Sequence, residues 1–369
     1  MEKRINVSFE KMNNFIIDAL VSYGVPKKDA IICADVLLQS DKKGIESHGC
    51  NRLKPIYIDR IKRGILNPIT NIEIIKDTFT TQVMDAHDGM GMVASHQMME
   101  SLIQKAKVYG ISMGVITNSS HYGIAGYYSD MAADAGMIGI TGTNARGSIA
   151  PTFGVENMLG TNPLTFSIPT DEKFHFTLDC ATSIYQRGKI EFYARSNQET
   201  PASAIVTSDG VPLSDSNKIL QYLVEGKAAL APLGGEGDVT AGYKGYGYAT
   251  VVEILSSALA GGLALRDLVE KDENGNKRPY HLGHFFIVIN PEFFMGLDVL
   301  KSRAGDILRT LRDSKKAPGQ ERIYTAGQKE YEIWLQRKDQ GVPLSKALQK
   351  EILEINEEKK LGYTFPFSK

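Results

Sequence analysis

Residues 46–53, Glu-Ser-His-Gly-Cys-Asn-Arg-Leu, lie between two stretches that have the apolar periodicity of amphipathic helices. If the second helix begins near Gly49, His48 lies at its N-terminus and Arg52 lies four residues further along the same face. A helix N-terminus lowers the pKa of an imidazole, so His48 would exchange a proton near neutral pH beside a guanidinium that can hold a carboxylate. This pairing indicates the oxidation of a 2-hydroxy acid. The alternative is that Ser47 only caps a helix and that His48 and Arg52 are solvated.

The composition is that of a soluble globular protein without a strong charge bias. The chain has 369 residues, enough for two domains, and 42% of them are hydrophobic and 23% charged. A formal net charge of −1 gives no field that would attract nucleic acid or an anionic membrane. Three scattered cysteines are too few for a disulfide framework or a zinc ribbon, and no metal site is expected. No window approaches the roughly 18 consecutive apolar residues of a membrane span, so we expect a cytoplasmic protein.

Helices are expected in the first 65 residues, and a region rich in strands follows. From residue 71 the apolar period changes from that of helices to that of strands. The expected helices are 8–23, 26–42, 50–63, one that ends near 109, 184–197, 248–262, 292–311 and 327–360, and the expected strands are 71–76, 80–85, 112–117, 137–143, 164–168, 175–179 and 283–290. Residues 198–240 have little pattern and are expected to be loops and turns.

Residues 89–94, Gly-Met-Gly-Met-Val-Ala, match the dinucleotide fingerprint G-x-G-x-x-A between a strand and a helix. That fingerprint needs an acidic residue at the end of the next strand, where it binds a ribose hydroxyl. The next strand ends instead in Asn118-Ser119-Ser120-His121. A glycine-rich turn that begins a helix is therefore favoured, and an ordinary Rossmann oxidoreductase is the alternative.

The segment 118–128, Asn-Ser-Ser-His-Tyr-Gly-Ile-Ala-Gly-Tyr-Tyr, places His121 between a strand and a helix that begins among small residues. Small residues let another backbone or a phosphate come close, and the amides of a first helical turn attract anions. His121 is therefore either a cofactor or catalytic contact or an ordinary polar loop residue.

Two glycine-rich segments carry further candidates. The loop 142–163 contains Arg146 and Thr161 with few large apolar groups, which indicates a loop that lines a site. Lys244 lies at the glycine-rich start of a helix and is a candidate phosphate contact, although the P-loop motif is absent.

Two strand ends also carry polar residues. Asp179 and Thr182 can bond a nucleotide ribose or cap the helix 184–197, and capping is the safer interpretation. His281 and His284 are three residues apart on a strand and point to opposite faces, which argues against a metal pair.

Taken together, these motifs resemble the malate/L-lactate dehydrogenase family that is distinct from the Rossmann-type malate and lactate dehydrogenases. That family includes ureidoglycolate dehydrogenase, sulfolactate dehydrogenase, 2,3-diketogulonate reductase and a piperideine-carboxylate reductase. The matching motifs are Ser47-His48-Gly49 with Arg52, Ser120–Tyr128, Leu159–Pro163, Asp179–Ser183, Arg187-Gly188-Lys189, Gly242–Gly247 and Gly283–Phe286. They follow the family's order over about residues 8–330.

The resemblance implies a mixed α/β fold with a non-Rossmann nicotinamide-binding domain. That domain would span residues 71–295 around a mixed β-sheet, and residues 1–70 and 296–369 would come together as a helical domain. The protein would be a homodimer with each site completed near the interface. Its partners would be small-molecule substrates, with no role for nucleic acid or membrane.

The resemblance also implies roles for single residues. His48 would be the proton donor or acceptor, Ser47 would orient it, and Arg52 would hold the substrate carboxylate. The implied neighbours of the substrate are Thr161 and Arg146, and the implied cofactor contacts are His121, Tyr122, Gly123, Ile124, Ala125, Asp179, Cys180, Ala181, Thr182, Lys244, Gly245 and His284. Some relatives give the proton transfer to the histidine that matches His121, so both histidines are catalytic candidates.

The implied reaction is hydride transfer between NAD, with NADP as the alternative, and a 2-hydroxy acid, above all malate or a lactate-like acid. A second hypothesis is a specialised dehydrogenase, such as one for ureidoglycolate. A third hypothesis, from a different functional class, is a catalytically silent cofactor-binding protein. The chain departs from the family at Tyr185-Gln186, where relatives often have small aliphatic residues. It departs again at Ala145-Arg146, where some relatives have lysine, and both differences bear on the choice of substrate.

Overall fold

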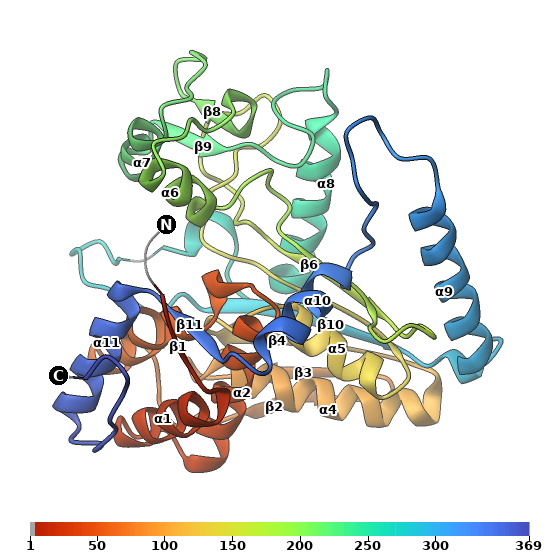
Figure 1. The fold of residues 1–369 in the computed structure, drawn as a ribbon, viewed down its shortest axis with the longest axis horizontal. Coiled ribbons are helices and arrows are strands. Elements are labelled where there is room, and N and C mark those ends of the chain that lie inside the picture. Colours follow the sequence, from red (N-terminus) through yellow and green to blue (C-terminus); the bar gives the residue numbers. More distant parts are fainter. Residues whose placement is uncertain (1–3, 270, 369) are drawn as a thin grey trace.

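A seven-stranded mixed sheet forms the centre of the molecule (Figure 1). Its strand order is β2-β3-β4-β10-β5-β6-β7. The computed structural model describes residues 4–269 and 271–368. The strands are β2 (Glu73–Asp77), β3 (Thr81–Asp85), β4 (Ile111–Ser119), β10 (Leu282–Ile289), β5 (Ile138–Thr143), β6 (Leu164–Ile168) and β7 (Phe176–Cys180). Neighbours pair antiparallel except β3 and β4, which are parallel. The mixed sheet is thus as expected.

The central strand β10 is buried on both faces because helices cover the two sides of the sheet. Phe286 and Val288 point to one side, where they pack with α4 (Gly91–Tyr109) and α5 (Gly126–Asp134). Phe285 points to the other side and packs with Val252 near the end of α8 (Gly242–Glu253). The alternation follows from the two-residue period of a strand.

The N- and C-terminal segments lie side by side (Figure 1), and their apolar residues share one hydrophobic cluster. The short strands β1 (Ile5–Val7) and β11 (Val342–Leu344) pair antiparallel. Phe15 and Phe365 pack edge to face with their ring centroids 5.3 Å apart. The helices of this region are α1 (Phe9–Ser22), α2 (Lys27–Lys42), α10 (Gln328–Arg337) and α11 (Lys346–Glu358). Where the domain boundaries fall stays a prediction.

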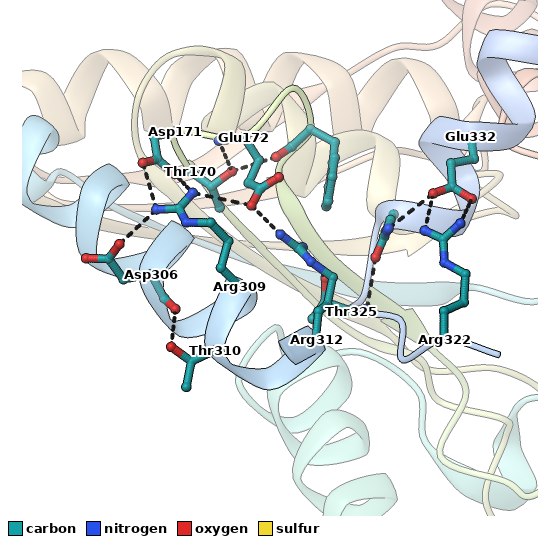
Figure 2. Close-up of polar contacts among 12 residues, drawn as sticks. Thr170, Asp171, Glu172, Asp306, Arg309, Thr310, Arg312, Arg322, Thr325 and Glu332 are labelled. Atoms are coloured by element: carbon teal, nitrogen blue, oxygen red, sulfur yellow. Dashed lines mark hydrogen bonds and ion pairs between the residues drawn. The ribbon is translucent and has the colours of Figure 1, made fainter. Parts of the chain in front are cut away.

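Helix α9 (Leu297–Asp313) is attached by ion pairs to the turn between β6 and β7 (Figure 2). Arg309 makes a two-pronged contact with Asp171, with N–O distances of 2.9 and 3.0 Å. Arg312 binds Glu172 and donates to Thr325 at 3.0 Å. The C-terminal segment is therefore fixed to the edge of the sheet before it returns to the first helices.

Three parts of the chain differ from the sequence-based expectation. Residues 327–360, expected as one helix, form α10, the strand β11 and α11, because Pro343 cannot continue a helical hydrogen-bond ladder. Residues 50–63 are not one helix: after the 3₁₀ turns η1 (Glu46–His48) and η2 (Cys50–Arg52), the chain forms the π-turn η3 (Leu53–Ile58) and a short α3 (Asp59–Lys62). Pro55 has no N–H to donate, which interrupts the α-helical ladder. Residues 198–240, expected as loops, contain β8 (Ile205–Thr207), α7 (Ser216–Glu225) and β9 (Ala228–Leu230), which pack beside α6 (Arg187–Arg195).

None of the helices in the described part of the chain has the length and apolar character needed to cross a membrane.

Candidate active site

Ser47, His48 and Arg52 form a hydrogen-bonded unit in the turn after α2. The Ser47 hydroxyl lies 2.8 Å from His48 Nδ1, and Arg52 Nε donates to the carbonyl oxygen of Ser47. All three residues are half-buried. Within the residues that the structure describes, the two terminal nitrogens of Arg52 have no hydrogen-bond or ion-pair partner. The guanidinium is thus held at Nε and keeps its fork free for a carboxylate.

Asp41, in the last turn of α2, holds this turn in place. Its carboxylate accepts the backbone N–H of Cys50 at 2.8 Å, and a methyl group on Gly49 would overlap it. Burial raises the pKa of Asp41 to about 6. Arg337 of α10 donates to the Asp41 carbonyl oxygen at 2.6 Å and pairs with Glu46. Nothing in the sequence singles out Asp41 or Arg337, because lone charges on amphipathic helices are usually solvated.

His121, from the loop between β4 and α5, lies beside His48. The two imidazole rings are nearly parallel, with an interplanar angle of 15° and centroids 5.7 Å apart. His121 Nδ1 contacts the Tyr57 hydroxyl at 2.7 Å and accepts the Gly123 N–H at 3.3 Å. The two histidines that compete for the proton-transfer role in the sequence are therefore neighbours in one site.

Both imidazoles are neutral at pH 7. Burial lowers the pKa of His48 to about 4, and the Arg52 charge adds to that effect. Burial also lowers the pKa of His121 well below its usual value, with further contributions from His48 and Arg52. The sequence predicts that His48 titrates near neutral pH because it lies at a helix N-terminus. The structure differs from that prediction, because burial lowers the pKa of His48 further and no long helix begins here. A neutral imidazole has a lone pair that can accept a proton.

A cavity of about 410 Å³ lies between α2, α5, β7 and α10. Ile124 and Asp179, two of the expected cofactor contacts, line it, and Ile45 joins it to the turn that carries His48. Its other lining residues are Gln39, Lys42, Lys43, Gly126, Asp130, Phe174, His175, Thr177, Leu178, Ala326, Gly327, Glu330, Tyr331 and Trp334. The volume is within the range of small-molecule sites.

Asp179 occupies the start of α5. Its carboxylate accepts the Gly126 N–H at 2.7 Å and the Thr165 hydroxyl at 3.0 Å. Capping of the helix 184–197 is therefore the wrong interpretation, and α6 has no side-chain cap. The expected anion site at the α5 start is filled by the chain's own carboxylate, and the small residue at Gly126 makes room for it, because a methyl group would come within 2.8 Å of Asp179 Oδ2.

A second group of expected contacts meets around Leu233. The Thr182 N–H and hydroxyl donate to the Thr161 carbonyl oxygen at 2.9 and 3.0 Å, and the Thr182 carbonyl oxygen accepts the Leu233 N–H at 2.9 Å. A methyl group on Gly245 would overlap the Leu233 backbone. Lys244, next to it at the start of α8, is exposed. Arg146 is exposed on the loop that follows β5.

His284 lies in the core of the sheet instead of on the surface of a site. Its side chain is fully buried, Nδ1 lies 2.7 Å from the Thr143 hydroxyl, and Nε2 lies 2.8 Å from the Ser119 hydroxyl. Its ring stacks on Tyr122 at a centroid distance of 4.4 Å. With both ring nitrogens bonded to its own chain, His284 has no free edge for a cofactor. The expected contacts Tyr122, Gly123, Ala125 and Ala181 are also buried, and Cys180 is half-buried.

A buried carboxylate on α8 holds the loops that were expected to line the site. Glu253 accepts hydrogen bonds from the side-chain amides of Asn162 at 2.8 Å and Asn144 at 3.4 Å, which lie at the two ends of the loop 142–163. It also accepts the N–H of Leu265, in the segment after α8, at 3.0 Å. No sequence motif includes Glu253, because its three partners are distant in sequence and only the fold brings them together.

The turn with the G-x-G-x-x-A pattern supports the His121 loop. Ser120 Oγ accepts the Gly91 N–H at 2.9 Å and donates to the Gly89 carbonyl oxygen at 2.8 Å. A methyl group on Gly91 would overlap the Ser120 carbonyl oxygen. The start of α4 therefore contacts its own chain where a Rossmann domain would bind a pyrophosphate.

Comparison with known proteins gives matches over nearly the whole chain. The sequence profile of the malate/L-lactate dehydrogenase family matches residues 7–353. The malate dehydrogenase of Pyrococcus abyssi is 38% identical over 354 residues, which cover 96% of this chain and 95% of the relative. The L-sulfolactate dehydrogenase of Methanocaldococcus jannaschii is also 38% identical, over 94% of this chain and 95% of the relative.

Solved structures agree with these matches. The crystal structure of malate dehydrogenase from Entamoeba histolytica is 42% identical, with a TM-score of 0.94 over 99% of this chain and 100% of that chain. The malate dehydrogenase structure from Pyrococcus horikoshii OT3 is 35% identical, with a TM-score of 0.86 over 97% of both chains.

Proposed function

The chain belongs to the malate/L-lactate dehydrogenase family, and we propose that its substrate pair is malate and oxaloacetate. As a family member it is a dehydrogenase that works with a nicotinamide cofactor on a 2-hydroxy acid. Malate is favoured because the relatives from two Pyrococcus species and the structural neighbour from Entamoeba carry that name.

The observation that carries the proposal is the free Arg52 fork beside a pair of neutral imidazoles. Arg52 would hold the substrate carboxylate with two charge-assisted hydrogen bonds and so fix the position of the neighbouring hydroxyl. His48 would accept the hydroxyl proton, and Ser47 would hold its ring through Nδ1. A bound nicotinamide cofactor would supply the hydride acceptor. In the reverse direction His48 would return the proton.

The cavity beside Ile45 fits the nucleotide part of such a cofactor. Phe174 and Tyr331 offer aromatic faces and stack on one another with centroids 5.7 Å apart. Lys42 supplies a positive charge, its Nζ 5.5 Å from the Trp334 ring centroid. We propose NAD as the cofactor, because arginine, which favours a 2′-phosphate, is absent from the lining residues. NADP is the alternative, because the positive charge of Lys42 could also bind a 2′-phosphate.

We further propose that His284 positions the loops of the site instead of contacting the cofactor. It connects Ser119, two residues before His121, with Thr143 at the end of β5. Thr161, Arg146 and Lys244 remain the proposed contacts at the substrate and phosphate ends of the site.

We propose a homodimer located in the cytoplasm. Exposed apolar residues follow one another along α8 and the turn after it, with Val251 48%, Ile254 52% and Leu259 53% exposed, and such residues are commonly covered in homodimers. Light scattering after gel filtration should give twice the mass of one chain. Cell fractionation tests the location.

A substrate panel tests the function. Purified enzyme is assayed with NAD and with NADP on malate, L-lactate, sulfolactate and ureidoglycolate, and on the matching oxo acids. We expect the highest kcat/KM with malate and NAD. Sulfolactate as the best substrate would support the second candidate, which the 38% identity to an L-sulfolactate dehydrogenase favours. Cofactor binding without turnover of any panel member would support a catalytically silent protein.

Arg52→Lys tests the substrate-binding role, with Arg63→Lys, an exposed arginine of the same segment, as the matched control. An ammonium cannot reproduce the two-pronged contact, so kcat/KM for malate should fall by about 10- to 100-fold while the cofactor Kd is unchanged. Equal kcat/KM in both variants would remove Arg52 from the site.

A further inference from the structure

Tyr57 is buried beside the catalytic pair and bonded to one of its members. Its side chain is fully buried, and its hydroxyl lies 2.7 Å from His121 Nδ1. The two rings meet edge to face at a centroid distance of 5.8 Å. Tyr57 belongs to the π-turn η3, and π-turns are frequent at functional sites. None of the sequence motifs includes Tyr57.

The Gly123 N–H decides the direction of the bond between Tyr57 and His121. A backbone N–H can only donate, and the Gly123 N–H donates to His121 Nδ1 at 3.3 Å. His121 Nδ1 is therefore an acceptor without a proton, and the Tyr57 hydroxyl, which is 3.5 Å from the His121 carbonyl oxygen but 2.7 Å from Nδ1, donates to the ring. A neutral imidazole carries one ring proton, so that proton is on Nε2.

We propose that Tyr57 is a positioning residue that fixes His121 as the Nε2–H tautomer, so that the outer edge of this ring is a hydrogen-bond donor. The proposal rests on the dehydrogenase function given above and divides its roles between the two histidines. His121 donates to an oxygen of the substrate and does not accept the hydroxyl proton. His48 is then the acceptor.

The arrangement leaves the outer edge of both rings available. Among the described residues, neither His48 Nε2 nor His121 Nε2 has a hydrogen-bond partner, and both residues are half-buried. Both Nε2 atoms are therefore free to bond a substrate oxygen. Tyr57 bonds His121 at Nδ1, the ring nitrogen opposite Nε2, and so leaves Nε2 free.

The tautomer is measured on the full-length protein without substrate or cofactor, by ¹⁵N NMR of histidine-labelled enzyme at pH 7. The His121 signals are assigned by their loss in His121→Gln, since the chain has seven histidines. We expect a protonated Nε2 and an unprotonated Nδ1. In Tyr57→Phe one of the two donors to Nδ1 is gone, and we expect signals from both tautomers.

Kinetics give the second readout. Tyr57→Phe should lower kcat about five- to tenfold, the worth of one hydrogen bond, and leave the cofactor KM unchanged. Tyr127→Phe is the matched control, because it also loses a half-buried hydroxyl bond, here to Asp35 at 2.9 Å. Its kcat should stay within about twofold of wild type. His121→Gln keeps an amide donor near the Nε2 position, so its kcat should fall only about tenfold. Replacement of a general base would lower kcat about 100-fold or more.

The outcomes separate the two proposals. A protonated Nδ1 in wild-type His121 overturns the tautomer assignment even if the enzyme oxidises malate. An unchanged tautomer and kcat in Tyr57→Phe overturns the role of Tyr57. A loss of about 100-fold in His121→Gln shows that His121 is the base and also overturns the proposal. If Tyr57→Phe does not fold, the wild-type spectrum and His121→Gln still decide the tautomer and the role of His121, on which the proposal depends. Absence of any dehydrogenase activity with the expected tautomer present rejects the proposed function alone.

Discussion

At His48, burial and the Arg52 charge act in the same direction and keep the imidazole neutral, with a pKa near 4. The spacing of Ser47, His48 and Arg52 predicts that these residue types meet in one turn, where the structure has them, and the chemistry assigned to them stays a prediction. It does not predict the charge state, because burial is a property of the fold. The sequence also gives no sign of Asp41, whose carboxylate holds the Cys50 N–H and fixes the turn.

The pKa of His48 leads to a prediction about the pH dependence of malate oxidation. His48 is active as a base in its neutral form, so kcat/KM, which reports the free enzyme, should fall only as the pH decreases toward about 4. A bound carboxylate offsets the Arg52 charge and raises the pKa of His48, so the acidic limb of kcat should lie about one pH unit higher. Steady-state rates between about pH 4 and 10 test this. An acidic limb of kcat/KM near the ordinary histidine value of about 6.5 would contradict it.

Gly49 should tolerate no side chain. Its backbone has an ordinary negative φ, so an alanine meets only the steric overlap with Asp41. We expect Gly49→Ala to lower the free energy of unfolding by about 1–3 kcal/mol and kcat about tenfold, since the His48 turn must shift. Gly247→Ala is the control, because its added methyl group has no atom within 4 Å apart from its chain neighbours and the backbone of its own helix. Equal stability and kcat in the two variants would show that the Asp41 contact is not needed.

At the scale of elements, the strands are predicted well and the segment around the site is not. The expected strands 164–168 and 137–143 are found as β6 and β5 within one residue, because strand runs and their turns are local patterns. The π-turn η3 is missed because the apolar period there is helical, and only the proline interrupts the ladder. Tyr57 therefore points to His121 in a way that the periodicity of residues 50–63 does not indicate.

Glu253 connects α8 to the site loops, and both of its oxygens should be needed as hydrogen-bond acceptors. Both of its oxygens accept hydrogen bonds, from Asn162, Asn144 and Leu265. In Glu253→Gln an NH₂ group takes the place of one accepting oxygen and faces an N–H donor of its former partner. We therefore expect the free energy of unfolding to fall by about 1–3 kcal/mol. The KM for malate should rise because the loops with Thr161 and Arg146 loosen. Chemical unfolding and kinetics against the exposed-site control Glu100→Gln measure both, and identical behaviour would disprove the role.

At the scale of the whole molecule, the N- and C-terminal segments meet although more than 300 residues separate them: Ile5 of β1 pairs with Leu344 of β11. Arg337 connects the C-terminal segment to the site through its contacts with Asp41 and Glu46. Composition and periodicity contain no information about such pairings. The resemblance to a family implied that the two ends come together, and the positions of the domain boundaries stay a prediction.

The buried histidines should make the stability of the whole molecule depend on pH. Burial lowers the pKa of His284 to about 3, below the ordinary value of 6.5 that it has in the unfolded chain. Between these values the unfolded state binds a proton that the folded state does not, so this contribution is present above pH 6.5 and is lost as the pH falls toward 3. Wild type should therefore lose more stability than His284→Gln between about pH 6.5 and 4.5, by up to about 1.4 kcal/mol per pH unit. Asp41, whose pKa is raised, acts in the opposite direction in both proteins. Parallel pH profiles of the unfolding free energy would contradict the assignment.

The most direct test of the site is the turnover of His48→Asn in malate oxidation at saturating cofactor. The control is His87→Asn, an exposed histidine whose positive φ of 46° asparagine readily adopts. If His48 accepts the hydroxyl proton, kcat should fall by about 100-fold or more in His48→Asn and stay at the wild-type level in His87→Asn, with equal cofactor KM in both. A kcat for His48→Asn within about threefold of the control would show that the proton goes elsewhere and that His48 is not the base.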